Sequence, residues 1–168
     1  ESEPNVMGFD EFYGYNCQRE AHTYYPEHLW HNQKKVEFPE NANLGRHAYS
    51  YYLIHQPALQ FIRRRKGEPF FALLTYTLPH AELNLPHDSI YLMYEDRFEE
   101  TPYDQPGSYF RSEKPRASFA AMVSRLDMYV GEVLDELKKQ GLDKNTIVFF
   151  TSDNGPHREG GADPDFFN

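Results

Sequence analysis

Two short polar clusters follow the two most apolar runs of the sequence, and their side chains are of types that bind cations and oxyanions. The run 70–76 leads to His80, and the run 146–152 leads to Asp153 and Asn154. Carboxylate and amide oxygens suit hard cations such as Ca²⁺, which take about six to eight oxygen ligands. This pair supplies two, so the others would come from elsewhere. Asp-Asn-Gly after a strand is also an ordinary turn signal, so an Asx turn is the alternative interpretation.

The histidines beside these runs could act on an anionic group. A histidine at a strand end can donate to a sulfate or phosphate oxygen, or protonate a leaving group. His80 stands in such a place, although a lone loop histidine often has no special role. His157 and Arg158 follow the Asp-Asn pair. They could contact an anion or sugar hydroxyls, or be solvated.

The elements that would position these clusters alternate between helix and strand. A helix is predicted from Pro57, which suits a first turn, to Gly67. The strongest helical pattern covers 116–139. The apolar runs 70–76 and 146–152 are typical of strands covered on both faces, hence of a parallel sheet. Strand, helix and strand in this order predict a right-handed crossover and an α/β layered fold. Ligands of such sheets bind at the carboxyl ends of the strands.

The remaining segments lack periodicity. Residues 1–50 are predicted to be a loop-rich region with short helical pieces, and 51–168 the strand–helix–strand part, interrupted by a loop over 81–114. Three histidines lie in the first region at spacings that fit no zinc pattern, so we expect separate loop residues: His22, His28 and His31.

The composition excludes several classes of function. The chain carries 26 acidic and 17 basic residues, a net charge of −9, and such a surface repels nucleic acid. The basic cluster 63–66 ends a predicted helix, where positive charge favours the dipole. A single cysteine, Cys17, excludes an internal disulfide framework. No apolar run approaches the roughly 18 residues of a membrane span. The 13 Tyr and 13 Phe could form a core or line a sugar or aryl pocket.

Three blocks, taken together, carry a resemblance to a known family. They are Gly-Phe-Asp-Glu-Phe-Tyr-Gly-Tyr at 8–15, the block from Pro-Phe-Phe to Pro-His-Ala at 69–81, and Thr-Ser-Asp-Asn-Gly-Pro-His at 151–157. In order and spacing the chain resembles the sulfatases over essentially its whole length. The resemblance implies an alkaline-phosphatase-like α/β fold and hydrolysis of sulfate esters (EC class 3.1.6). It also implies calcium as cofactor and a formylglycine nucleophile made from a Cys/Ser-x-Pro-x-Arg motif.

The same resemblance assigns roles to the candidate residues. Asp153 and Asn154 match the later pair of calcium ligands, and His80 matches the histidine that holds the sulfate and assists the leaving oxygen. The other candidates are polar residues. Gln18 is expected near the sulfate, and His157 and Arg158 are expected near the sugar.

The nucleophile motif is absent. Cys17 has no proline two positions on, and Ser2-Glu3-Pro4 is followed by Val6 where arginine is required. The family's upstream Asp pair and its Gly-Lys-Trp-His-like segment are absent too. We therefore interpret 1–168 as an internal part of a sulfatase catalytic domain, with formylglycine supplied by a missing upstream segment.

Expectations for the chain and its parent protein follow from that interpretation. The isolated chain should be inactive and bind calcium weakly, and surfaces exposed by truncation could cause self-association. The family suggests a periplasmic or secreted parent protein. Sulfated carbohydrates and aryl sulfates are both open as substrates. The alternatives are a phosphatase, phosphodiesterase or phosphonate hydrolase of the same fold, or a non-catalytic glycan-binding relative.

Overall fold

The computed structural model describes residues 3–65, 67–105 and 109–166, which fall into two compact units, Glu1–Ala58 and Leu59–Asn168. Two residues of the sequence argument lie outside the described residues: Ser2 of the incomplete nucleophile motif and Lys66 of the basic cluster. Within the described ranges, no helix is both long and apolar enough to cross a membrane.

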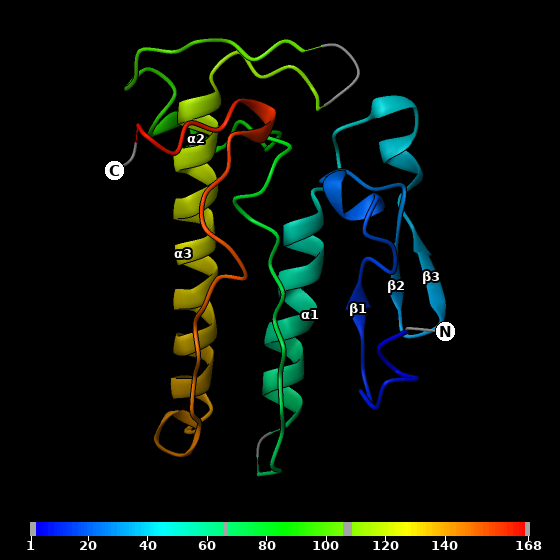
Figure 1. Ribbon diagram of the computed structural model, residues 1–168. Helices are drawn as coiled ribbons and strands as arrows, with labels where there is room; N and C mark the ends of the chain where they lie inside the picture. Colours follow the sequence, from blue (N-terminus) through cyan, green and yellow to red (C-terminus); the bar gives the residue numbers. More distant parts are fainter. Residues whose placement is uncertain (1–2, 66, 106–108, 167–168) are drawn as a thin grey trace. The chain divides into compact units, whose positions relative to one another are not determined.

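The first unit contains a small antiparallel sheet, in the order β1 (Tyr13–Gly14), β2 (His28–His31) and β3 (Lys34–Glu37) (Figure 1). A two-residue turn, with Asn32 at a φ of 53°, joins the second and third strands. His28 and His31 therefore lie in a strand and not in the loops expected for them, whereas the short helical pieces expected in this region are present as 3₁₀ helices. These strands are too short and too charged for their alternation to be visible in the sequence. The elements are β1 (Tyr13–Gly14), η1 (Glu20–His22), β2 (His28–His31), β3 (Lys34–Glu37) and η2 (Pro39–Leu44).

Buried tyrosines form the core of this unit. Tyr24, Tyr49 and Tyr51 are at most 2% exposed, and the rings of Tyr24 and Tyr51 meet edge to face at 5.2 Å. Buried Asn41 ties the surrounding loops together. Its amide donates to two carbonyls and its Oδ1 accepts from two backbone N–H groups, so its main hydrogen-bonding capacity is used. The first unit thus uses its aromatic residues as core.

Helix α1 (Ser50–Arg64) begins seven residues before the predicted start, with Pro57 inside it. A proline in a helix interior lacks the N–H of one hydrogen bond and costs about 3 kcal/mol. The first turns are held by other contacts. The N–H of Ser50 donates to the carbonyl of Tyr24 at 2.8 Å, and Ser50 and His55 are buried. Tertiary packing therefore outweighs the local preference of Pro57.

Helix α3 (Pro115–Lys139) confirms the predicted helix and dominates the second unit. At its end Gly141 has a φ of 71°, which favours glycine. The N–H of Leu142 donates to Leu137 O, and that of Gly141 to Lys138 O. This is a Schellman motif, and it satisfies carbonyls that the helix leaves without partners. Short 3₁₀ turns follow at η3 (Asp143–Asn145) and η4 (Glu159–Gly161).

The buried face of α3 is more polar than its apolar pattern predicted. Met122 and Leu137 are buried, but Val123 and Leu134 are 43% and 46% exposed. Arg125, with no exposed surface, lies on the buried face and pairs with an aspartate.

That aspartate, Asp88, holds α2 (Ser89–Leu92) to α3. One of its oxygens accepts from Arg125 at 2.7 Å, and the other accepts from the first N–H groups of α2. A second ion pair, between Arg63 of α1 and Glu136 of α3, joins those two helices at 2.8 Å. Ionic contacts therefore organise this helix layer.

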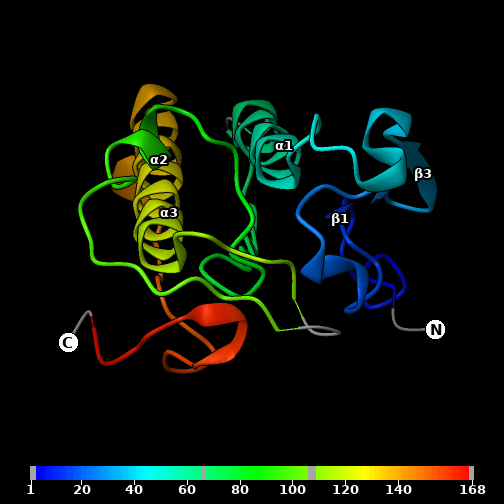
Figure 2. The same ribbon diagram turned by 90° about the horizontal axis from the view of Figure 1, so that it is seen from above.

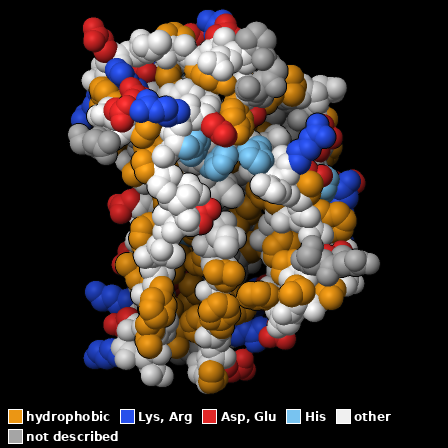
Figure 3. All heavy atoms as spheres, in the orientation of Figure 1, with side chains coloured by type: hydrophobic (Ala, Val, Ile, Leu, Met, Phe, Trp, Pro, Cys, Tyr) orange, Lys and Arg blue, Asp and Glu red, His pale blue; other side chains and the backbone are white. Residues whose placement is uncertain are grey.

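The runs 70–76 and 146–152 are extended, but no described residue forms a ladder with them. They lie on one side of the layer formed by α3 and residues 59–64 of α1, and run in the same direction (Figures 1 and 2). Hydrophobic side chains gather on this face (Figure 3). Phe71 is 73% exposed and Phe149 is 88% exposed. The prediction of two buried strands was wrong for the described residues, because burial and strand pairing both require neighbours that these residues do not provide.

We predict that Asp88→Ala destabilises the protein by about 3 kcal/mol, because removing one partner of a buried ion pair is costly and the cap of α2 is lost as well. Asp88→Asn keeps an oxygen for the cap, so it should cost less. Denaturant unfolding of both variants, with the exposed Asp104→Ala as control, measures the difference. Equal effects of all three substitutions would show that the pair is not structurally important.

Glu136 should make stability depend on pH in the acid range. The Arg63 guanidinium, followed by the Gln140 amide, lowers the pKa of Glu136 from 4.5 to about 2. Because the folded-state pKa lies below the unfolded value, this contribution is complete above about pH 4.5 and is lost as pH falls towards 2. When unfolding is measured between these pH values, the free energy of unfolding should fall less steeply with pH for Glu136→Gln than for the unsubstituted protein. Parallel curves would contradict the assignment.

Candidate functional site

His80 and His157, from two blocks of the sequence 77 positions apart, lie together in the second unit. Their ring centroids are 5.0 Å apart and the rings are tilted by 45°. His80 follows the extended segment 70–76, and its N–H donates to Thr77 O at 2.8 Å, which turns the chain. Both side chains are partly buried. The structure thus brings together two of the predicted site residues.

Hydrogen bonds indicate how the two rings carry their protons. Nδ1 of His157 accepts from the N–H of Glu159 at 3.0 Å, so a neutral His157 ring carries its proton on Nε2. Burial lowers the pKa of His157, and His80 lowers it further, whereas the charge of Glu159 opposes both. Nδ1 of His80 lies within hydrogen-bonding distance of Ala81 O and therefore acts as donor. Because Nδ1 of each ring is engaged in these contacts, Nε2 is the nitrogen through which either ring would contact a ligand.

Asp153 and Asn154 lie in an exposed loop that is stabilised locally. The hydroxyl of Ser152 donates to Asn154 O at 2.7 Å, and the Asn154 amide donates to Gly155 O at 2.8 Å. This turn leaves a carboxylate and an amide oxygen side by side in sequence. The described residues contain no cluster of three or more His, Cys, Asp or Glu side chains suited to a metal. A carboxylate and an amide oxygen are ligand types that calcium accepts, but two oxygens would supply only part of its shell of about six to eight.

Close backbone contacts fix the loop that carries His157. Gly160 and Gly161 have φ values of 65° and 91°, where glycine is favoured. A Cβ on Gly160 would lie 2.7 Å from Cβ of Ala81, and one on Gly161 would lie 2.7 Å from Cβ of Tyr103. The loop therefore packs directly against the residue that follows His80. Sequence reasoning missed this pair, although two consecutive glycines after a polar cluster were a usable signal.

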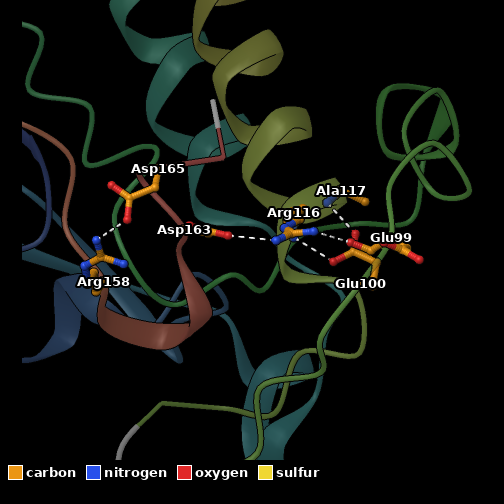
Figure 4. Close-up of polar contacts among 7 residues, drawn as sticks. All are labelled: Glu99, Glu100, Arg116, Ala117, Arg158, Asp163 and Asp165. Atoms are coloured by element: carbon orange, nitrogen blue, oxygen red, sulfur yellow. Dashed lines mark hydrogen bonds and ion pairs between the residues drawn. The ribbon is translucent and has the colours of Figure 1, made fainter. Parts of the chain in front are cut away.

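Charged side chains surround the same loop. Arg158 forms an exposed ion pair with Asp165 (Figure 4). The hydroxyl of Tyr109 donates to Glu159 at 2.6 Å, and this bond, with burial, raises the pKa of Tyr109 to about 12. Tyr109 and Glu159 were not among the sequence candidates, because neither stands in a recognisable spacing.

Gln18 belongs to the first unit, whereas the other five candidates belong to the second. Gln18 is exposed, and its main-chain carbonyl oxygen lies 2.9 Å from Nδ1 of His22. Neighbouring Cys17 is exposed as a free thiol.

The contact between the two histidines gives a prediction for His157. His80→Gln should raise the pKa of His157 toward its ordinary value, because the substitution removes the neighbouring ring that lowers this pKa. NMR titration of ¹³C-labelled histidine rings measures the change. His87→Gln is the control, because its ring stacks on Tyr91 instead. An unchanged titration of His157 in the first variant would contradict the proximity.

Comparison with known proteins places these features in a family. The family model for sulfatases matches residues 1–165. The chain is 30% identical over 158 residues to the uncharacterized sulfatase YdeN of Escherichia coli, covering 92% of this chain and 24% of the relative. It is 31% identical over 163 residues to N-acetylgalactosamine-6-sulfatase of Mus musculus, covering 90% and 27%.

A solved structure agrees in fold. The crystal structure of Ps i-CgsB in complex with k-i-k-neocarrahexaose superposes with a TM-score of 0.57 and 25% identity, covering 83% of this chain and 31% of that one. The chain thus spans between about a quarter and a third of the length of these relatives. The α/β, alkaline-phosphatase-like fold class predicted from the sequence is confirmed. With the family model matching nearly its whole length, the chain belongs to the sulfatase family.

Proposed function

We propose that residues 1–168 are an internal part of the catalytic domain of a sulfatase that removes sulfate from sulfated carbohydrates. The observation that carries the proposal is the contact between His80 and His157. It joins two of the sequence blocks that resemble sulfatases, and it does so at the end of an extended segment, where ligands of such folds bind. Family membership supports sulfate ester hydrolysis in general.

His80 is proposed to act on the ester itself. With Nδ1–H donating to the Ala81 carbonyl, the protonated ring carries its second proton on Nε2, and it can donate that proton to a sulfate oxygen and give it up to the leaving oxygen. Neutral His157 has its proton on Nε2, so it can donate to a sugar oxygen without adding charge. Arg158 would face the sugar. Its exposed pair with Asp165 is of a type that contributes little to stability and can open.

Calcium and the nucleophile complete the proposal. Asp153 and Asn154 would hold the ion with ligands from outside residues 1–168, because two oxygens are too few. Bound calcium would stabilise the charge of the sulfate group. The nucleophile, a formylglycine, would also come from outside these residues, since no Cys/Ser-x-Pro-x-Arg sequence occurs in them. Gln18 is a further candidate for contact with the sulfate.

The names of similar proteins support a carbohydrate substrate. One solved relative is in complex with k-i-k-neocarrahexaose, and another relative is named N-acetylgalactosamine-6-sulfatase. A sulfated glycan is therefore the substrate class we propose, in preference to a simple aryl sulfate. A periplasmic or secreted location of the whole protein is part of the same proposal.

The test uses the complete protein in which these residues occur, assayed for sulfate release from sulfated oligosaccharides and 4-nitrophenyl sulfate. His80→Ala should lower kcat roughly 100-fold or more, the usual contribution of a general acid. His87→Ala is the matched control and should be nearly neutral. Residues 1–168 alone should show no turnover, even with added calcium.

Other outcomes distinguish the alternatives. Hydrolysis of 4-nitrophenyl phosphate in preference to the sulfate would favour a phosphatase of the same fold. Glycan binding by the complete protein without hydrolysis would favour a non-catalytic relative. Full sulfatase activity in His80→Ala would remove the assigned role of His80 while leaving the family unchanged.

A further inference from the structure

The start of α3 is joined to a loop that is far away in sequence. The carboxylate of Glu100 accepts from the N–H of Arg116 at 3.0 Å and from the N–H of Ala117 at 2.8 Å (Figure 4). These are first-turn N–H groups that have no partner within the helix, and a negative charge is favourable there. Glu100 therefore ties its loop to the first turn of α3.

The side chain of Arg116 connects this turn to two separate segments. Nη1 donates to Glu99 O at 2.6 Å, and Nη2 donates to Asp163 at 2.9 Å. The guanidinium also lies over the ring of Phe166, 4.0 Å from its centroid. The contact with Arg116 lowers the pKa of Asp163, so the carboxylate stays charged at neutral pH. One side chain thus holds the loop at 99–100 and the loop at 163–166.

The second of these loops is the continuation of the segment that carries His157. Between His157 and Asp163 the chain passes through η4, where Gly160 and Gly161 pack against Ala81 and Tyr103. The loop is therefore held at two places. The glycines set how closely it approaches the His80 end, and Arg116 fixes the far end at Asp163.

We propose that Arg116 is a positioning residue for the carbohydrate side of the site. It acts through Asp163 to keep the loop 157–166 in place, and so keeps His157 beside His80, without touching substrate itself. Lysine cannot replace it fully. A guanidinium can donate to two segments at once and stack on an aromatic ring, whereas an ammonium lacks the planar fork. The proposal rests on the proposed function and adds a determinant of binding on the sugar side.

The first test compares two substrates of the complete protein. In Arg116→Lys and in Asp163→Asn, KM for a sulfated oligosaccharide should rise on the order of tenfold, as expected for a lost charged hydrogen bond. The value of kcat/KM for 4-nitrophenyl sulfate, which has no sugar to contact the loop, should change less than about twofold. The matched control is Arg111→Lys, because Arg111 pairs with Asp104 and Glu113 and not with this loop. Equal losses on both substrates would indicate a general structural defect and overturn the proposal.

The second test does not depend on activity. In ¹³C-histidine spectra, the ring signals and pKa of His157 should shift in Arg116→Lys and in Asp163→Asn, while those of His87 stay fixed. If the protein cleaves no sulfate ester, the proposed function fails, but this readout still decides the positioning role. Unchanged His157 signals in both variants would overturn it, whatever the activity.

Discussion

The second unit depends on a positive charge buried inside it. Arg125 has no exposed surface, and removing a guanidinium from water is expensive unless a paired carboxylate offsets the cost. Asp88 supplies that carboxylate and at the same time caps α2. The pair therefore fixes the position at which the segment after His80 returns to α3. Without this anchor, the first of the two histidine-bearing segments would have a much weaker connection to the helix.

Helix α3 is the common support for the loops of the candidate site. Its first turn carries Arg116, its middle carries Arg125 and its last turns carry Glu136, and each of these side chains forms an ion pair with another segment. A helix is stiff, so three contacts along it define positions that long irregular loops could not define alone. This explains how loops without regular structure can place His80 and His157 at 5.0 Å.

The charges near the site serve organisation as much as binding. The protein is acidic, and its proposed substrate is an anion, so unpaired cations would be expected where the sulfate binds. Arg116 and Arg158 instead pair with aspartates. In the part of the chain that the structure describes, His80 is then the group that we propose for contact with the sulfate. The extended segments at 70–76 and 146–152 form no ladder with any described residue, and side chains such as Phe71 and Phe149 stay exposed.

The sequence by itself determined helix α3 and the family. Pro115 and Gly141 mark the ends of α3, because proline suits a first turn and glycine adopts the positive φ of a helix end. The three sequence blocks identified the sulfatases and named His80 and His157 as candidates. Periodicity could not show the start of α1, where contacts with Tyr24 outweigh Pro57, or the antiparallel sheet formed by very short strands.

Only the tertiary structure decided which distant residues meet. The approach of Gly160 to Ala81, the pairing of Arg125 with Asp88 and the bridge from Arg116 to Asp163 join positions between 37 and 79 residues apart. Spacing along a chain reports which residues share a face of one element. It does not report which element that face will contact, because such contacts depend on packing and charge pairing across the whole unit.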